Sequence, residues 1–301
     1  MSVEMEYSIV DVFTRNALAG NPLAVVVDAV GLTTEAMQSV AREFNLSETT
    51  FIQRRDPARE RTEGVRVRIF TTQEELPFAG HPTLGTASVL KTLAPEVIVD
   101  NQLKLALNVG SVPVRFEPGS DNSTTGIFGE MTQRDPEFGV EFDPAEVARL
   151  TGLRIDDLDP SCPPQAVSTG TAFAIVVLRS VDALARLNVN HRESTPWLRE
   201  RGARWFYIVA PTGTQDPAFR ARMQFYGGED PATGSAAGCA ISHLVARGLV
   251  ESGRRILLQQ GVEIGRLSEL FLSAKTNKAK ISDVCVAGST VLVAKGHLFL
   301  P

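Results

Sequence analysis

The sequence predicts an α+β fold of two similar halves, each a barrel-like β-sheet wrapped around a central helix. Two repeated stretches lead to this prediction. ELPFAGH at residues 75–81 returns as EDPATGS at residues 229–235, and GNPLAVVV at residues 20–27 returns as GTAFAIVV at residues 170–177. Both copies come about 150 residues downstream and in the same order, which indicates an internal duplication.

The order of expected elements is the same in both halves. In the first half the amphipathic pattern of Thr34–Phe44 predicts a helix. Short apolar runs predict the strands of that half, which are Ile9–Phe13, Leu23–Val27, Thr50–Gln53 and Val65–Phe70. In the second half the expected strands are Ala174–Leu178, Trp205–Val209 and Ala221–Phe225.

After each repeated motif the residues become small and apolar, TLGTASVL at residues 83–90 and AAGCAISHLV at residues 236–245. Such residues around most of a helix predict that other structure encloses it. The free N–H groups and the dipole at a helix start favour an anion there, and Gly80 and Gly234 let a ligand approach the backbone. If the halves face each other, both helix starts would meet at one cleft.

The break between the halves is expected at Glu117–Thr125, where Pro, Gly, Asp, Asn and Ser leave nothing apolar to bury. We therefore predict an N-terminal half at residues 1–118 and a C-terminal half at residues 126–287.

Composition excludes several classes of partner. Hydrophobic residues make up 43% and charged residues 22% of the 301 residues, and the net charge is −5, as in ordinary globular proteins. There is no Lys/Arg-rich run, so no nucleic-acid partner is expected. The start, MSVEMEYSIV, lacks the basic and apolar regions of a signal peptide, and the aliphatic runs are too short to span a bilayer. We expect a cytoplasmic protein without membrane contact.

The spacing of the cysteines and histidines does not indicate a metal site. Three scattered cysteines, Cys162, Cys239 and Cys285, are typical of reduced thiols. The four histidines have no metal-ligand spacing, and no Gly-rich phosphate loop is present. We expect neither a metal nor another cofactor.

Three motifs together resemble the PhzF family, the phenazine-biosynthesis-like isomerases: NLSETTF at residues 45–51, RIFTTQEELPFAGHPTLG at residues 68–85 and GEDPATGSAAG at residues 228–238. The resemblance covers nearly the whole chain. It implies the diaminopimelate epimerase-like fold, in which the last strand, about residues 288–301, completes the N-terminal half. It also implies a homodimer and a cofactor-independent isomerase, since the best-understood member isomerises trans-2,3-dihydro-3-hydroxyanthranilate by moving a proton.

Position by position, the resemblance implies four catalytic residues: Glu48, His81, Asp230 and Ser235. It places the substrate carboxylate near Gly80, Gly234 and Ser235. Glu48 would remove a proton from a small carboxylated substrate and return it at another carbon, because its conjugate acid stays in place. His81 and Asp230 would hold or relay protons on the polar groups of the substrate.

The motifs depart from those of the epimerases and racemases of this fold. Those enzymes place a cysteine just before each motif glycine, where this chain has Ala79 and Thr233. Cys239 comes five residues after Gly234, on the expected helix rather than at its start. A mechanism with two thiols is therefore excluded unless other groups replace them.

Structural alternatives remain for each candidate. Glu48 would otherwise be a solvated carboxylate at the start of a strand, and His81 a first-turn residue before Pro82, a residue suited to that turn. Asp230 and Ser235 suit helix capping as well as catalysis. Other functions also remain open: an epimerase, racemase or lyase for another small carboxylate, or a non-catalytic binding or scaffold protein that keeps the cleft.

Several further polar residues are expected to be structural. Glu75 and Glu229 occupy the same position in both motifs, which favours a role in the turn. The alternating arginines are expected on the solvent face of strands, namely Arg66, Arg68, Arg220 and Arg222. His191 is expected in a polar loop, and His243 and His297 on helix and strand surfaces.

Overall fold

The structure is a computed structural model of the whole chain, and it describes residues 3–117, 126–214, 216, 218–225, 228–278 and 280–300. The expected break at Glu117–Thr125 lies outside these residues, apart from Glu117. The chain forms two compact units. The first consists of Met1–Thr132 and Ala287–Pro301, and the second of Gln133–Val286.

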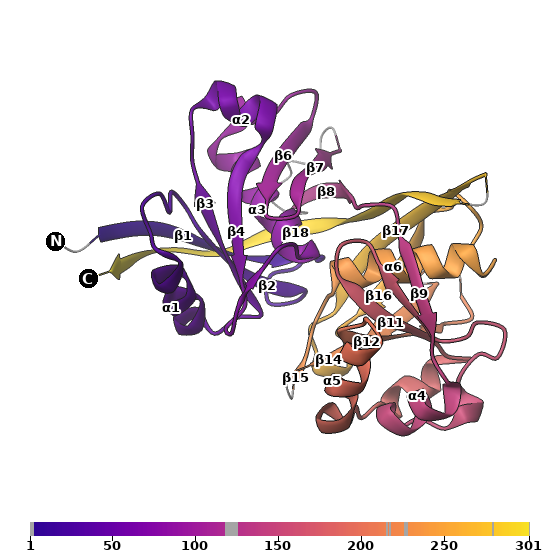
Figure 1. Ribbon diagram of the computed structural model, residues 1–301. Coiled ribbons are helices and arrows are strands. Elements are labelled where there is room, and N and C mark those ends of the chain that lie inside the picture. Colours follow the sequence, from indigo (N-terminus) through magenta and orange to yellow (C-terminus); the bar gives the residue numbers. More distant parts are fainter. Residues whose placement is uncertain are drawn as a thin grey trace. The chain divides into compact units, whose positions relative to one another are not determined.

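The described part of the first unit contains a closed barrel of eight strands (Figure 1). Hydrogen bonds join them in the order β1-β2-β3-β4-β6-β7-β8-β18, and β18 pairs with β1 to close the barrel. The strands are β1 (Val3–Val12), β2 (Asn21–Val26), β3 (Glu48–Gln53), β4 (Val65–Phe70), β6 (Gln102–Leu107), β7 (Gly110–Phe116), β8 (Ile127–Thr132) and the C-terminal part of β18 (Lys280–Leu300). Short β5 (Glu75–Leu76) pairs with β4, and the helices are α1 (Thr34–Phe44), α2 (Pro57–Glu63) and α3 (Gly80–Leu93).

The second unit follows the order β18-β17-β16-β13-β12-β11-β10-β9. Its strands are β9 (Glu137–Glu141), β10 (Gln165–Ser168), β11 (Ala172–Val177), β12 (Trp205–Pro211), β13 (Phe219–Arg222), β16 (Ile256–Gln260), β17 (Ser268–Asn277) and the N-terminal part of β18. A separate pair joins β14 (Gln224–Phe225) to β15 (Gly228–Glu229). Its helices are α4 (Pro144–Thr151), α5 (His191–Glu200) and α6 (Gly234–Ala246). Short 3-10 turns occur at Pro95–Val97, Ile155–Asp157, Val181–Arg186 and Val262–Ile264.

The two units share one strand pattern, as the repeated sequence blocks predict. In the first unit the pairings run antiparallel, parallel, antiparallel and parallel from β1 through β2, β3 and β4 to β6. The second unit gives the same sequence of directions from β10 through β11, β12 and β13 to β16. The predicted α+β fold of two similar halves is therefore confirmed.

A buried helix lies at the centre of each unit. In α3 every residue from Gly80 to Leu90 is buried, and in α6 every residue from Gly234 to Val245. A Cβ atom on Gly85 would lie 2.7 Å from a methyl group of Leu23 in β2. The small residues of these helices therefore allow the strands to approach closely, as the sequence predicts.

Several local expectations are wrong. His191, expected in a polar loop, is the first residue of α5. The expected strand Ala221–Phe225 is interrupted, because the carbonyl of Met223 accepts a hydrogen bond from the N–H of Asp230 at 2.9 Å and the chain turns into β14. His243, expected on a helix surface, is fully buried, with Nε2 3.1 Å from Sγ of Cys162. Burial lowers the pKa of His243 to about 4 and raises the pKa of Cys162 to about 12, so both groups are neutral at pH 7.

Each unit contains an arginine–glutamate pair at corresponding positions of the repeated sequence. The arginines lie in β4 and β13, and the glutamates in the short strands β5 and β15. Arg68 donates to both oxygens of Glu75 at 2.8 and 2.5 Å, and Arg222 donates to both oxygens of Glu229 at 2.9 and 2.5 Å. These contacts support the structural role expected for both glutamates. Arg222, however, is 8% exposed, so the expectation of a solvent-facing side chain is wrong for this residue. Its guanidinium also donates to the carbonyl of Leu184.

The difference in burial predicts unequal costs of breaking these two pairs. Arg222→Met leaves the Glu229 carboxylate buried without its counter-charge, which should lower the free energy of unfolding by about 3–5 kcal/mol. Arg68→Met, at the more exposed pair, should cost about 1 kcal/mol. Urea unfolding of both variants at pH 7 measures the two values. Equal losses would contradict this assignment.

Candidate active site

Glu48 and His81 lie together in the first unit. Glu48 is the first residue of β3 and His81 the second residue of α3, and Oε2 of Glu48 is 3.4 Å from Nε2 of His81. The side chain of Glu48 is 15% exposed and that of His81 only 3%. The pair therefore combines a partly exposed glutamate side chain, whose Oε2 atom is buried, with an imidazole enclosed by the protein.

Asn21 completes this cluster, and the sequence analysis did not single it out. It is the first residue of β2, is fully buried, and places Nδ2 3.2 Å from Nδ1 of His81. Gly20 precedes it with φ 65°, and a Cβ there would lie 2.4 Å from the carbonyl oxygen of Val12. A buried polar residue after a glycine, within a repeated block, is the sequence signal that could have identified this position.

Burial makes His81 neutral. Removal from water disfavours the imidazolium and lowers the pKa of His81 from 6.5 to about 3. A negative charge on Glu48 would favour the imidazolium. It would have to stabilise that form by roughly 5 kcal/mol for the ring to be protonated at pH 7. His81 therefore carries a single ring proton at pH 7 and can act as one hydrogen-bond donor and one acceptor.

A second polar cluster surrounds Asp230 in the second unit. Oδ2 of Asp230 accepts a 2.7 Å hydrogen bond from the hydroxyl of Thr233. Gln260 donates to the carbonyl of Asp230 at 2.8 Å and to Oγ1 of Thr233 at 2.9 Å, and its own Oε1 accepts from the Tyr207 hydroxyl at 2.9 Å. Burial raises the pKa of Tyr207, so its phenol remains a donor. Gln260 and Tyr207 were not predicted from the sequence, because they lie far from the motif in the chain.

The predicted anion-binding positions are the first turns of the two central helices. Gly80 and Gly234 are the first residues of α3 and α6, and Ser235 is the second residue of α6. The N-cap residues are Ala79 and Thr233, and neither side chain accepts a hydrogen bond from its helix. Neither Asp230 nor Ser235 occupies an N-cap position. The backbone N–H groups of these turns are suited to an anion.

Cys239 is poorly suited to catalysis. It lies in the middle of α6, is fully buried, and has Sγ 3.5 Å from the hydroxyl of Thr169. Burial raises its pKa to about 11. A thiol of this kind is protonated at pH 7 and is not a nucleophile or base.

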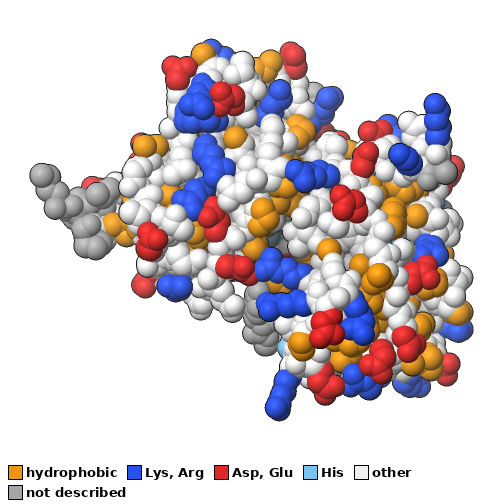
Figure 2. All heavy atoms as spheres, in the orientation of Figure 1, with side chains coloured by type: hydrophobic (Ala, Val, Ile, Leu, Met, Phe, Trp, Pro, Cys, Tyr) orange, Lys and Arg blue, Asp and Glu red, His pale blue; other side chains and the backbone are white. Residues whose placement is uncertain are grey.

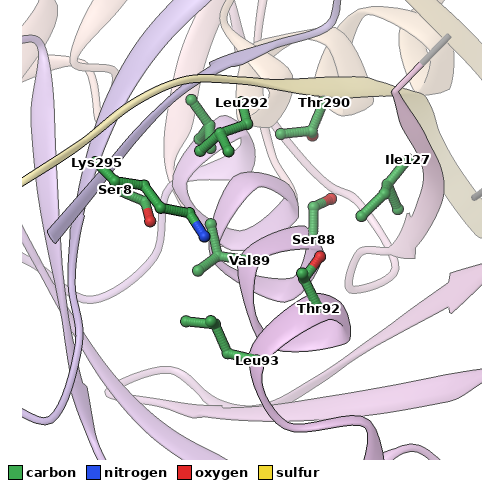
Figure 3. Close-up of a pocket in the computed structure, with 10 residues that line it drawn as sticks. Ser8, Ser88, Val89, Thr92, Leu93, Ile127, Thr290, Leu292 and Lys295 are labelled. Atoms are coloured by element: carbon green, nitrogen blue, oxygen red, sulfur yellow. The ribbon is translucent and has the colours of Figure 1, made fainter. Parts of the chain in front are cut away.

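A recess of about 60 Å³ lies at the C-terminal end of α3, away from His81 (Figure 3). Ser88, Val89, Thr92 and Leu93 form its helical side, and strands β1, β8 and β18 form the rest. Figure 3 shows the Lys295 side chain extending into it. None of the predicted site residues lines this recess, so it is separate from the candidate active site.

Comparison with known proteins shows the family. The family model described as phenazine biosynthesis-like protein matches residues 10–296. The chain is 34% identical to an uncharacterized isomerase of Mesorhizobium japonicum, with 98% of both chains covered. It is 36% identical to the trans-2,3-dihydro-3-hydroxyanthranilate isomerase of Pseudomonas aeruginosa, with 98% and 99% covered. The chain belongs to the phenazine-biosynthesis-like PhzF family and is an isomerase.

Solved structures agree with this conclusion. A structure titled as a predicted epimerase from Pseudomonas aeruginosa matches with a TM-score of 0.81 at 34% identity, covering 98% of this chain and 99% of that one. A hydroxyproline epimerase from Agrobacterium vitis matches with a TM-score of 0.63 at 11% identity, over 99% and 93% of the two chains, which shows the epimerase-like fold alone.

Two further observations concern the helices and the distribution of charged side chains. No helix within the described residues is both long and apolar enough to cross a membrane. On the face drawn in Figure 2, acidic and basic side chains lie interspersed.

The depressed pKa of His81 predicts a specific pH dependence of stability. Its pKa is about 3 when folded and near 6.5 when unfolded, so the unfolded chain binds the proton first as the pH falls. The neutral ring therefore contributes its full stability above pH 6.5, and about 1.4 kcal/mol should be lost per pH unit well below that.

The variant His81→Asn removes this contribution and isolates it from that of His243. Urea unfolding of wild type and variant between pH 7.5 and pH 5 should show a stability difference that shrinks as the pH falls. A difference that stays constant over this range would mean that His81 is not held neutral by burial.

Proposed function

We propose that the protein is a cofactor-independent isomerase that moves a proton on a small carboxylated substrate. The contact between Glu48 and neutral His81 carries this proposal, because it places a partly exposed carboxylate beside a buried, neutral imidazole. The substrate class is supported by relatives named trans-2,3-dihydro-3-hydroxyanthranilate isomerase, which act on a small ring carboxylate.

Glu48 performs both proton transfers in this proposal. Its carboxylate takes a proton from an activated C–H bond, and the bonding electrons shift into the conjugated system of the substrate. The Glu48 carboxylic acid then delivers a proton to another carbon, so the substrate is isomerised and the enzyme is unchanged. Nε2 of His81 lies 3.4 Å from Oε2 without a hydrogen bond in the resting structure, and its N–H would steady the carboxylate between the two steps. Such contacts are often long before substrate binds.

We assign the polar groups of the second unit to the same reaction. Asp230 would hold a proton of the substrate's polar substituent, and its network with Thr233 and Gln260 fixes its orientation. The first-turn N–H groups of α3 and α6, with the hydroxyl of Ser235, would bind the substrate carboxylate. This preorganised set of donors would stabilise the developing negative charge, usually the largest catalytic contribution.

A second candidate activity is epimerisation, racemisation or elimination on another small carboxylate. The similarity to a structure titled as an epimerase favours it, since the same proton abstraction begins each reaction. Incubation with a metabolite library in deuterated water separates the cases. An isomer of the substrate supports our proposal, with label at the new carbon to the extent that the Glu48 acid exchanges with solvent before it returns the proton. An inverted stereocentre or loss of water supports the alternative.

The mechanism predicts that Glu48→Gln abolishes turnover. Glutamine keeps nearly the same shape but cannot accept the proton, so both turnover and deuterium wash-in should fall by at least about 10²–10⁴-fold. Ligand binding should remain largely intact. Steady-state kinetics and mass spectrometry measure the two rates.

Cys239→Ala is the matched control, since it removes the thiol of α6 without touching Glu48. It should leave exchange near the wild-type rate. If Glu48→Gln kept wild-type exchange while Cys239→Ala lost it, the glutamate assignment would be wrong, and a thiol mechanism would replace it.

We also propose that the enzyme is a homodimer in the cytoplasm. Closed two-fold dimers are the commonest oligomers of soluble enzymes, and Cys162 and Cys239 are buried thiols, as is usual in a reducing compartment. Sedimentation at micromolar concentration should give about twice the chain mass of 32.6 kDa. A single 32.6 kDa species would contradict the dimer.

A further inference from the structure

His81 presents a problem of proton placement. The neutral ring has one proton and two nitrogens, and each nitrogen faces a different group. Nε2 faces the Glu48 carboxylate, which accepts hydrogen bonds but cannot donate when ionised. Nδ1 faces the amide of Asn21, which can present either its NH₂ group or its carbonyl oxygen. The orientation of Asn21 therefore bears on which nitrogen carries the proton.

Both contacts agree on one tautomer. The NH₂ group of Asn21 lies 3.2 Å from Nδ1, where it donates to an unprotonated nitrogen. The proton is then on Nε2, which faces Oε2 of Glu48 at 3.4 Å. The opposite tautomer would turn a nitrogen lone pair toward the carboxylate and two N–H groups toward each other. It is disfavoured at both ends.

We infer that Asn21 is a positioning residue that fixes the tautomer of His81 and so keeps the ring proton on Nε2, the nitrogen that lies 3.4 Å from Glu48. Asn21 is fully buried at the start of β2, and its side chain is confined there by the barrel. It contacts the imidazole, and we assign its effect on Glu48 to that contact. Partners of this kind, which orient a functional histidine through its other nitrogen, are well known around metal sites.

The consequence concerns the second half of the proposed reaction. With the proton held on Nε2, His81 cannot take the proton that Glu48 removes from substrate, because no lone pair faces the glutamate. The transferred proton then stays on Glu48 until it returns to substrate. The positioning role rests on the proposed function only in this kinetic consequence, and the tautomer itself can be measured in the resting protein.

The decisive measurement is the ring ¹⁵N spectrum of histidine-labelled protein at pH 7, assigned by loss of the His81 signals in His81→Asn. We expect a protonated Nε2 and an unprotonated Nδ1 in wild type. Glu48→Gln should keep this pattern, because Asn21 still donates to Nδ1 while the glutamine can rotate its oxygen toward Nε2. The pattern should become a mixture in Glu48→Gln/Asn21→Leu. Asn16→Leu, an exposed control in the preceding loop, should change nothing.

Two results would overturn the inference: a proton on Nδ1 in wild type, or its movement to Nδ1 in Glu48→Gln alone. The second would show that Glu48, not Asn21, sets the tautomer. Both use proteins with Asn21 intact, so they decide the question even if Asn21→Leu fails to fold.

Kinetics give an independent readout in the wild-type background. Asn21→Leu should lower kcat by about tenfold to a hundredfold with KM nearly unchanged, since Asn21 acts through the ring. A change in KM alone would assign Asn21 to substrate binding instead. If the spectra agree with the inference while Glu48→Gln retains full turnover, the proposed function fails and the tautomer assignment stands.

Discussion

The enclosure of α3 within a closed barrel is the constraint on which the candidate site depends. An imidazole in the first turn of an exposed helix would titrate near pH 6.5, but here strands surround the helix and the pKa of His81 falls to about 3. Small residues make this possible, since a side chain at Gly85 would collide with Leu23. The packing of the barrel thus determines the protonation state of His81, a residue of the candidate site.

The two units share one architecture, but the proposed base lies in the first unit alone. Leu23 corresponds to Phe173 in the repeated block, and the parallel registers place Glu48 beside Leu23 and Trp205 beside Phe173. The position of the proposed base is therefore a tryptophan in the second unit, where its ring packs on Phe173 at 5.8 Å. The parts that both units share are the helix starts and the two arginine–glutamate pairs. One base in one unit fits a reaction in which a single group removes and returns the proton.

Local patterns predicted the parts of this molecule that local forces decide. Thr34–Phe44 was predicted with the bounds it has, because its amphipathic face is continuous and Thr33 caps it. The enclosed helices followed from their small residues. Long-range contacts were not accessible in the same way. His243 is buried against Cys162, 81 residues away, and Asn21 contacts His81 across 60 residues. Neither contact can be recognised from the residues next to it in the sequence.

The neutrality of His81 also suits the demands on Glu48. An imidazolium 3.4 Å away would stabilise the carboxylate strongly and make it a weaker base, because an opposite charge at this distance lowers a carboxyl pKa. A neutral N–H stabilises the same carboxylate by a hydrogen bond without a full charge. In the proposed mechanism this allows Glu48 to accept a proton from carbon and still release it. The buried barrel interior, the neutral imidazole and the single carboxylate are thus three aspects of one arrangement, in which the reversible basicity of Glu48 depends on keeping water away from the ring beside it.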